Sequence, residues 1–453
     1  ILLHYIKLMK IKVPLLPFVV YKRFLKNSWS ISWPMLLIMT FEFLISLTDV
    51  YIAGTIEKKY QAAVGFTSQF YFIFIVFANA LTIGTVSVLS RQFTANESNL
   101  PNNIFSIVIT TIVSGLFLSI SGVVLTAFIV PLTNIPISIK PISINLLQLY
   151  AAGLMFHFLL INTNGILRAC GNIKKSLVTM ALVCILNIGL NFYLVYHTTW
   201  GYKGIALSTI ISLAIGSIIN LYFTYPLLKG FNRYIINTVK KVISIGWPSG
   251  ILQISWQLGG TVLFLIISLL PAHQVEIMAA FTNGLRIESA IFLPAFAFNM
   301  ANSVVIGNLL GKKEYKEAFT TGLITAFLAV IFILVLTVIV IVNAPLLTSF
   351  LTTNAIVKNE TLKYLYIVML SEPFMAWAVV LGGGLNGAGD TRGVTKIVVL
   401  SLWLVRIPLS YFLGIHLQYG AVAMYWSMNM SIFIHTIFLT RRYIKAEWLS
   451  IKV

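Results

Sequence analysis

The stretch SISWPMLLIMTFEFLISLTDVYIAG, residues 30–54, is long and apolar enough to span a bilayer as a helix, yet it contains two carboxylates. A bilayer core needs about 20 mostly apolar residues in a helix. Glu42 and Asp49 return to the same face of such a helix at about 100° per residue. Pro34, near the start, predicts a bend. Carboxylates kept inside a membrane usually line a cavity and take part in transport.

The composition places the whole chain in the membrane. Of its 453 residues, 58% are hydrophobic and 9% are charged, which is typical of a polytopic membrane protein. The sequence shows no catalytic triad, Walker loop or dinucleotide glycine pattern, so we expect neither an enzyme nor a bound cofactor. Cys170 and Cys184 indicate neither a disulfide framework nor a metal site.

Apolar runs of about 20 residues between polar breaks predict an all-α fold of twelve membrane spans. The spans start near residues 30, 64, 103, 144, 176, 204, 242, 275, 317, 361, 395 and 419. The longest polar interval divides them six and six. We therefore predict a basic N-terminal segment at 1–27, an N-lobe at 28–227, a linker at 228–241, a C-lobe at 242–440 and a tail at 441–453.

The net charge of +19 follows from membrane topology. If the N-terminus is cytoplasmic, 23 Lys and Arg residues fall on the inner side and 6 on the outer side. The positive-inside rule then predicts that both termini are cytoplasmic. Anionic membrane lipids are expected partners and nucleic acid is not. Residues 1–27 do not form a cleavable signal, and since the first methionine is Met9, the true start site is open.

The two halves of the chain resemble each other. Ser30–Pro34 recurs as Ser244–Pro248, and Leu167–Lys174 recurs as Leu385–Arg392. Each half holds six spans, an even number, so both halves start on the same side of the membrane and the repeats are parallel. Parallel repeats are typical of transporters that rock two lobes about a central cleft.

The acidic face of the first span has no counterpart in the second half, where Trp256 and Leu263 stand at the equivalent positions. Polar side chains of other spans could surround Asp49, because such side chains turn inward in membrane bundles. The candidates in spans four to six are Tyr150, Asn164, Asn187, Asn191 and Thr209. Each could instead be structural hydrogen-bonding glue, and either acid could be a hydrated group near a helix end. His157 shares a face with Tyr150, and a lone histidine there is more often a packing residue.

The C-lobe offers a second group of candidate cleft residues. They are Gln253, Gln257, Arg286, Glu288 and Glu372. Arg286 and Glu288 are two positions apart and cannot face each other on a helix. We predict a buried ion pair between Arg286 and Glu372, which suits a structural role as well as a substrate site.

Four motifs together resemble the multidrug and toxic compound extrusion (MATE) family: Thr48–Gly54, Ala279–Pro294, Gly307–Gly311 and Leu385–Arg392. The resemblance covers about residues 28–440. It implies a monomeric antiporter of the bacterial inner membrane, with two six-helix lobes and no cofactor. Such a protein exports organic cations or amphiphilic drugs in exchange for H⁺ or Na⁺.

The resemblance also implies roles for single residues. In family members with an acidic N-lobe, the aspartate of the first span binds H⁺ or Na⁺ beside polar residues of spans four to six. That role maps onto Asp49, with a helix bend at Pro34. Position 191, often aspartate in the family, is Asn191 here, which leaves Asp49 as the main carboxylate, assisted by Glu42. The C-lobe acids of the Na⁺-coupled branch have no clear match, so the DinF-like branch is more similar. The only metal ion to expect is Na⁺ at Asp49.

Two other functions stay open. A flippase for a lipid or lipid-linked oligosaccharide would need several cationic residues in the cleft, whereas only Arg286 and Arg406 lie within predicted spans. A scaffold or receptor is harder to reconcile with the internal repeat and the one-sided acidic helix.

Overall fold

A computed structural model describes residues 18–133 and 135–451, and every regular element in these ranges is a helix. A lipid-embedded backbone must satisfy its hydrogen bonds within the protein, which a helix does within one segment. The predicted all-α fold class is therefore confirmed.

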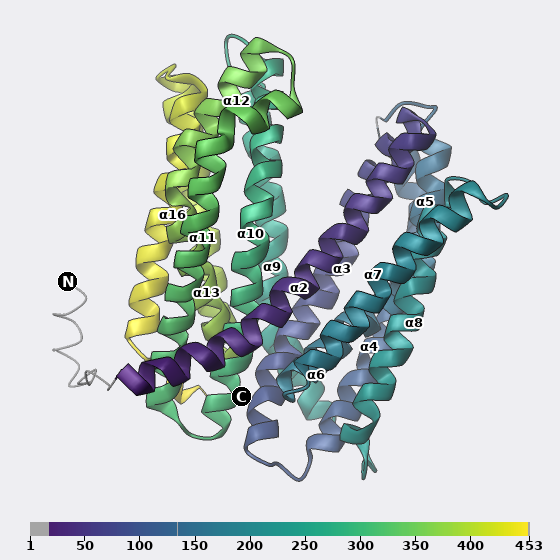
Figure 1. Cartoon of the computed structure of the whole chain (residues 1–453), viewed down its shortest axis with the longest axis vertical. Coiled ribbons are helices and arrows are strands. Elements are labelled where there is room, and N and C mark those ends of the chain that lie inside the picture. Colours follow the sequence, from purple (N-terminus) through teal and green to yellow (C-terminus); the bar gives the residue numbers. More distant parts are fainter. Residues whose placement is uncertain (1–17, 134, 452–453) are drawn as a thin grey trace.

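The helices form two lobes, which we call the N-lobe and the C-lobe (Figure 1). The N-lobe comprises α2 (Phe18–Ile56), α3 (Lys58–Thr94), α4 (Leu100–Leu132), α5 (Lys140–Ala152), α6 (Leu154–Ala169), α7 (Ile173–Tyr196) and α8 (Lys203–Leu228). The C-lobe begins with α9 (Ile236–Ile267), α10 (Gln274–Gly311), α11 (Tyr315–Leu351), α12 (Ala355–Val368) and α13 (Glu372–Gly387). It ends with α14 (Thr391–Ser401), α15 (Ile407–Tyr411), α16 (Gly420–Ile444) and the short helix Glu447–Ser450. Two π-helical segments, Leu402–Arg406 and Phe412–His416, flank α15.

The number of membrane spans agrees with the prediction. Eleven helical segments of the described chain are long and apolar enough to cross a membrane, or twelve when α5 and α6, bent by 48°, count as one. Two boundaries differ from expectation. The helix α2 begins at Phe18 and α9 begins at Ile236, inside the predicted linker. Hydropathy marks the part of a helix that crosses the membrane, whereas polar residues with good helix propensity extend the helix beyond it. Of the predicted N-terminal segment, residues 1–17 lie outside the described residues.

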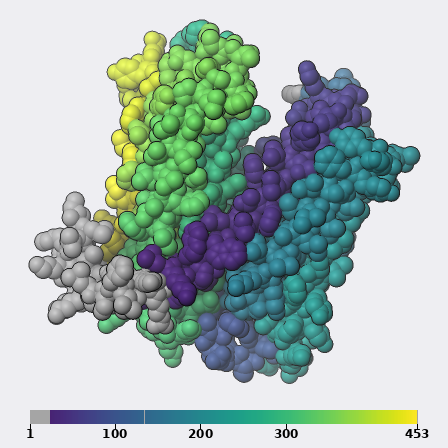
Figure 2. Space-filling view, in the orientation of Figure 1, coloured from purple at the N-terminus to yellow at the C-terminus, as the bar shows by residue number. Residues whose placement is uncertain are grey.

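The two lobes meet at one end and diverge at the other. Figure 1 shows α12 and α5 far apart, whereas α13 and α6 lie near the closed end. The space-filling view shows the resulting hollow, with α2 running across its front from one lobe to the other (Figure 2). Any site between the lobes is therefore accessible from the end where α5 and α12 lie.

The first helix of each repeat packs against the second helix of the other repeat. The N-lobe helix α2 contacts α7 of its own lobe and α10 and α11 of the C-lobe, and α9 contacts α3 and α14. Between α9 and α3 the backbones almost touch, because a Cβ at Gly84 would lie 2.0 Å from the carbonyl oxygen of Val242, and one at Gly246 would lie 2.1 Å from that of Ala80. Small residues permit such close packing in membrane bundles. The lobes are thus joined through crossed helices.

At the closed end the last turn of α3 binds backbone carbonyls of the C-lobe. The Arg91 guanidinium donates from Nη1 to the carbonyl of Ile451 at 2.6 Å and from Nη2 to that of Ala388 at 2.7 Å. Thr94 Oγ1 donates to the carbonyl of Asn308 at 2.8 Å. We call the contacts of Arg91 with Ala388 and Ile451 the Arg91 clasp. They tie the N-lobe to the end of α13 and to the segment after α16.

Replacing Arg91 with alanine removes both donors of the clasp. Hydrogen bonds from a charged group contribute about 1.5–3 kcal/mol each, so we expect Arg91→Ala to lower the free energy of unfolding by about 2 kcal/mol. Thermal unfolding of the purified protein in detergent should show a lower midpoint. Arg441→Ala is the matched control, because Arg441 is exposed near the end of α16. Equal midpoints for the two variants would contradict a stabilising clasp.

Candidate functional site

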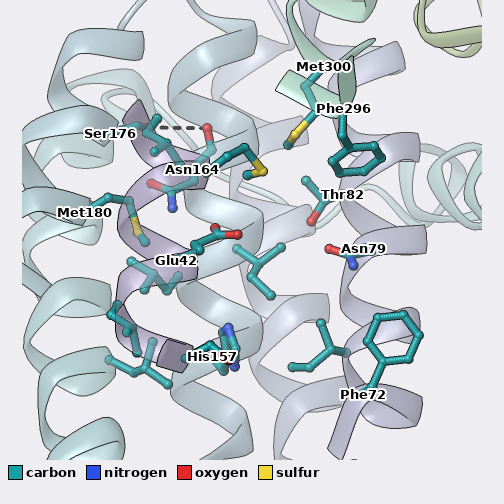
Figure 3. A pocket seen from close by; sticks show the side chains of 18 of the residues that line it. Glu42, Phe72, Asn79, Thr82, His157, Asn164, Ser176, Met180, Phe296 and Met300 are labelled. Carbon is teal, nitrogen blue, oxygen red and sulfur yellow. Dashed lines mark hydrogen bonds between the residues drawn. The ribbon is translucent and has the colours of Figure 1, made fainter. Parts of the chain in front are cut away.

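A cavity of about 360 Å³ lies between the lobes. The N-lobe supplies most of its wall, including Glu42, Asp49, Tyr150, Asn164 and Thr209. The C-lobe supplies the opposite side, where Figure 3 shows Phe296 and Met300 facing the side chains of the N-lobe. This volume is within the usual range for a small-molecule pocket.

Asp49 is buried and its carboxylate accepts three hydrogen bonds from neutral side chains. Asn191 Nδ2 donates to Oδ1 at 2.7 Å, and Thr209 Oγ1 donates to Oδ2 at 3.1 Å. The hydroxyl of Tyr150 lies 3.5 Å from Oδ2. Asn187 supports this arrangement, since its Nδ2 donates to Thr209 Oγ1 at 3.0 Å and its Oδ1 accepts from Asn191 at 3.2 Å. The structure thus brings four of the predicted polar residues together around Asp49.

Asp49 has no cationic partner among the described residues that would neutralise its ionised form. Within the described residues, the acids that form ion pairs are Glu57, Glu360, Asp390 and Glu447. Asp49 is not one of them. Hydrogen bonds from amides and hydroxyls stabilise a carboxylate, but they supply no positive charge. Binding of a proton or a small cation would remove the charge imbalance at this position.

Glu42 and Asn164 lie apart from the Asp49 cluster but in the same cavity. Figure 3 shows Glu42 projecting into the space, with Asn164 above it and His157 below. Asn164 accepts a hydrogen bond from Asn220 Nδ2 at 2.7 Å. His157 Nδ1 lies 2.8 Å from the hydroxyl of Tyr71. The two acids therefore have different surroundings, and Asn164 is not among the hydrogen-bond donors of Asp49.

Pro34 lies inside α2, between two parts of the helix that contact different lobes. Before it, Ser28 Oγ accepts a hydrogen bond from Thr325 of α11 at 2.9 Å. After it, the helix carries Asp49 into the N-lobe. A proline inside a helix removes one backbone hydrogen bond and favours bending at that point. The bend predicted at Pro34 would therefore change the relation between Asp49 and the C-lobe.

The five predicted C-lobe candidates do not line this cavity. Gln253 accepts from Asn79 Nδ2 at 3.3 Å and Gln257 Nε2 donates to Gln69 at 3.1 Å, so both join α9 to α3. The predicted Arg286–Glu372 ion pair is wrong: Arg286 is exposed, Glu372 is fully buried, and the ion pairs of the described residues do not join them.

The predicted Arg286–Glu372 pair fails because of the helix geometry of α10, where residues two positions apart point in different directions. Glu288 faces the interior and accepts a hydrogen bond from the hydroxyl of Tyr364, which leaves Arg286 outside. Arg406 takes the place predicted for Arg286. It is buried, donates from Nε to Ser431 at 2.8 Å, and interacts electrostatically with Glu288 and Glu372.

Arg168 lines the cavity from the end of α6, and the sequence motifs did not predict this position. Its position in the repeat was a usable signal. Leu167–Lys174 corresponds to Leu385–Arg392, so Arg168 corresponds to Asn386, and both residues line the cavity. Arg168 was hidden among the Lys and Arg residues assigned to loops, since only Arg286 and Arg406 were assigned to predicted spans.

Comparison with known proteins gives consistent matches over most of the chain. The MatE family model matches residues 34–193 and 248–412. The uncharacterized transporter YisQ of Bacillus subtilis is 23% identical over 440 residues, which cover 94% of this chain and 95% of that protein. The probable multidrug resistance protein NorM of Thermotoga maritima is 23% identical over 431 residues, covering 90% and 89%.

The fold also matches solved structures. One is a multidrug resistance MATE family transporter of the MOP superfamily in an outward-facing conformation. It superposes with a TM-score of 0.87 at 19% identity and covers 95% of this chain and 97% of its own. The two-lobe arrangement of twelve spans is therefore that of a known transporter fold.

Two aspartates allow a matched test of the charge at Asp49. Asp390 forms a bidentate ion pair with Arg442, at 2.5 and 2.7 Å. We expect Asp390→Asn to lower the thermal unfolding midpoint, because it leaves Arg442 without its partner. Asp49→Asn should leave the midpoint unchanged or raise it, because the amide can still accept from Asn191 and an uncompensated buried charge is removed. A lower midpoint for Asp49→Asn than for Asp390→Asn would contradict this assignment of charges.

Proposed function

Because the chain belongs to the MatE family, the family that its motifs resemble, we propose that it is a secondary active multidrug efflux antiporter. Its substrates are organic cations or amphiphilic drugs, and it exchanges them for H⁺ or Na⁺. The observation that carries this proposal is the buried carboxylate of Asp49 in the wall of an interlobe cavity, held by neutral donors alone. The multidrug resistance relatives support the substrate class.

The surroundings of Asp49 suit either coupling ion. A proton would neutralise the carboxylate without disturbing its hydrogen bonds. Hard cations such as Na⁺ prefer oxygen ligands. Asp49 and the hydroxyl of Thr209 supply such oxygens, and Asn191 Oδ1 is buried without a hydrogen-bond partner among the described residues. That unused acceptor fits a cation bound beside Asp49.

The crossed helix α2 provides the mechanical link in this proposal. Ion binding at Asp49 changes the packing of the C-terminal half of α2, while Ser28 holds its N-terminal half against α11. Bending at Pro34 accommodates the difference between the two halves. The substrate then leaves the cavity on the open side, and the lobes rock to expose the opposite side.

The distribution of basic residues supports an outward-open state. The closed end carries a group of basic residues: Arg91, Lys312, Lys313, Arg392, Arg441 and Lys445. By the positive-inside rule we expect this end, and with it both termini, on the cytoplasmic side of a bacterial inner membrane. The cavity then opens outward. We keep the DinF-like branch as the preferred subdivision, because the carboxylates of the described residues that line the cavity, Glu42 and Asp49, are both on the N-lobe helix α2.

We expect Asp49→Asn to abolish ion-coupled efflux. Cells that carry this variant should export ethidium at least tenfold more slowly than wild type, because the amide keeps the shape of the site but cannot take up a proton or neutralise a cation. Glu97→Gln is the matched control, since Glu97 is exposed after α3, and it should export at the wild-type rate. Normal efflux by Asp49→Asn at equal expression would contradict the proposed role of Asp49 in ion-coupled efflux.

Imposed gradients in proteoliposomes identify the coupling ion. We expect substrate movement to follow either a pH gradient or a Na⁺ gradient, and we expect the response to disappear in Asp49→Asn. Each gradient is applied separately, with the membrane potential clamped. Substrate flux that responds to neither gradient would show that the protein is not an antiporter for these ions.

A further inference from the structure

Tyr71 of α3 joins two residues that lie on either side of the bend between α5 and α6. Its hydroxyl lies 2.8 Å from Nδ1 of His157 in α6, and their rings stack with centroids 5.7 Å apart. Its ring also packs against the ring of Tyr150 in α5, at a centroid distance of 5.3 Å. All three side chains line the interlobe cavity. We call these three residues the Tyr71 bridge.

The Tyr71 bridge spans a break in one membrane span. The helices α5 and α6 are bent by 48°, with Gly153 between them. A Cβ at Gly153 would lie 2.5 Å from Cγ1 of Ile210 in α8, so the break is packed closely against a neighbouring helix. Tyr150 and His157 belong to different segments of this span, and their contacts with Tyr71 fix one segment relative to the other.

The contact between Tyr71 and His157 is a polar contact in apolar surroundings. Tyr71 packs beside the buried side chains of Leu154 and Phe158. A polar group in such surroundings loses free energy when its hydrogen-bond partner is removed. The contact forms with either tautomer of a neutral imidazole, since a hydroxyl both donates and accepts. The hydrogen bond therefore fixes the orientation of the Tyr71 ring.

Tyr150 connects the bridge to Asp49. Its hydroxyl lies 3.5 Å from Oδ2 of Asp49, at the outer limit of a hydrogen bond. Asn191 and Thr209 donate to the same carboxylate over shorter distances, 2.7 and 3.1 Å. A small displacement of the Tyr150 ring therefore decides whether Asp49 has a third donor. Hydrogen bonds to a carboxylate favour its charged form over its protonated form.

We propose that His157 is a positioning residue of the ion site. Through Tyr71 it holds the Tyr150 hydroxyl on Asp49, and so it determines how readily Asp49 takes up the coupling ion. The inference rests on the proposed role of Asp49 in ion binding and extends that site to a residue that does not itself donate to the carboxylate.

Two other ionisable groups of the described residues line the same cavity. They are Glu42 on α2 and Arg168 on α6. Among the described residues, neither forms a hydrogen bond with the Tyr71 bridge. A test that compares variants in which both groups are kept therefore leaves their charges the same throughout.

Carbodiimide labelling tests the proposal without measuring transport. Dicyclohexylcarbodiimide reacts with protonated carboxyl groups, and tandem mass spectrometry of the labelled peptide distinguishes Asp49 from Glu42. The midpoint of Asp49 labelling against pH is measured on the purified full chain in detergent. We expect Tyr150→Phe to raise this midpoint by about half a pH unit, or about threefold in proton affinity, because a donor to the carboxylate is lost. Tyr71→Phe and His157→Phe keep an aromatic ring but lose the hydrogen bond between them, and each should raise the midpoint by a smaller amount.

The route of the effect is tested in the Tyr150→Phe background. If His157 acts through Tyr150, His157→Phe should cause no further shift when Tyr150 is already replaced. His157→Asn, which can keep a hydrogen-bonding group near the position of Nδ1, should stay close to the wild-type midpoint. A shift of full size for His157→Phe in the Tyr150→Phe background would overturn the proposal, because His157 would then act on Asp49 by another route.

The controls separate this inference from the proposed function. Tyr222→Phe and His197→Phe make the same replacements at exposed positions and should keep the wild-type midpoint. Labelling of wild-type Asp49 that does not change with pH would contradict its proposed role as the ion-binding group. A pH-dependent wild-type profile that is unchanged in folded His157→Phe would overturn the positioning role alone.

Discussion

The connection between the two lobes depends on the first helix of each repeat, which packs against the other repeat. Each of α2 and α9 packs on the second helix of the opposite repeat, and between α9 and α3 the contact is so close that only glycine fits at position 84. A helix shared in this way cannot follow both lobes when they move. It must tilt, slide or bend. Pro34 lies between the part of α2 that contacts α11 and the part that carries Asp49. A movement of the lobes and the binding of an ion at Asp49 would therefore both act on α2.

Three buried arrangements of charge differ in what they leave unbalanced. Asp390 is balanced by Arg442. In the C-lobe, Arg406 lies among two carboxylates and a tyrosine, so part of their charge is met by a residue of the protein itself. Among the described residues, Asp49 has hydrogen-bond donors but no cationic partner. A residue whose charge is already met has little to gain from an external ion, whereas Asp49 gains the full effect. The two lobes therefore differ in whether a buried carboxylate has a cationic partner, more than in their number of acids.

The sequence predicted the spans and the surroundings of Asp49 because both follow from patterns along a helix. Apolar runs mark membrane helices, and polar residues within them turn inward to find partners. Asn187, Asn191 and Thr209 followed that rule. The Arg286–Glu372 pair failed because spacing tells which residues share a face, but not which face is buried. Arg168 was not predicted because the polar last turn of a helix that lines the cavity has the same residue composition as a solvated loop.

The Arg91 clasp has a consequence for how the protein responds to its surroundings. Its acceptors are the carbonyl oxygens of Ala388 and Ile451, and its donor is a guanidinium that stays protonated in proteins. None of these groups changes charge over the pH range of a living cell. The strength of the clasp is therefore independent of acidity on that side. In the antiport that we propose, the response to an ion gradient therefore enters through the cavity and reaches the clasp through the packing of the helices.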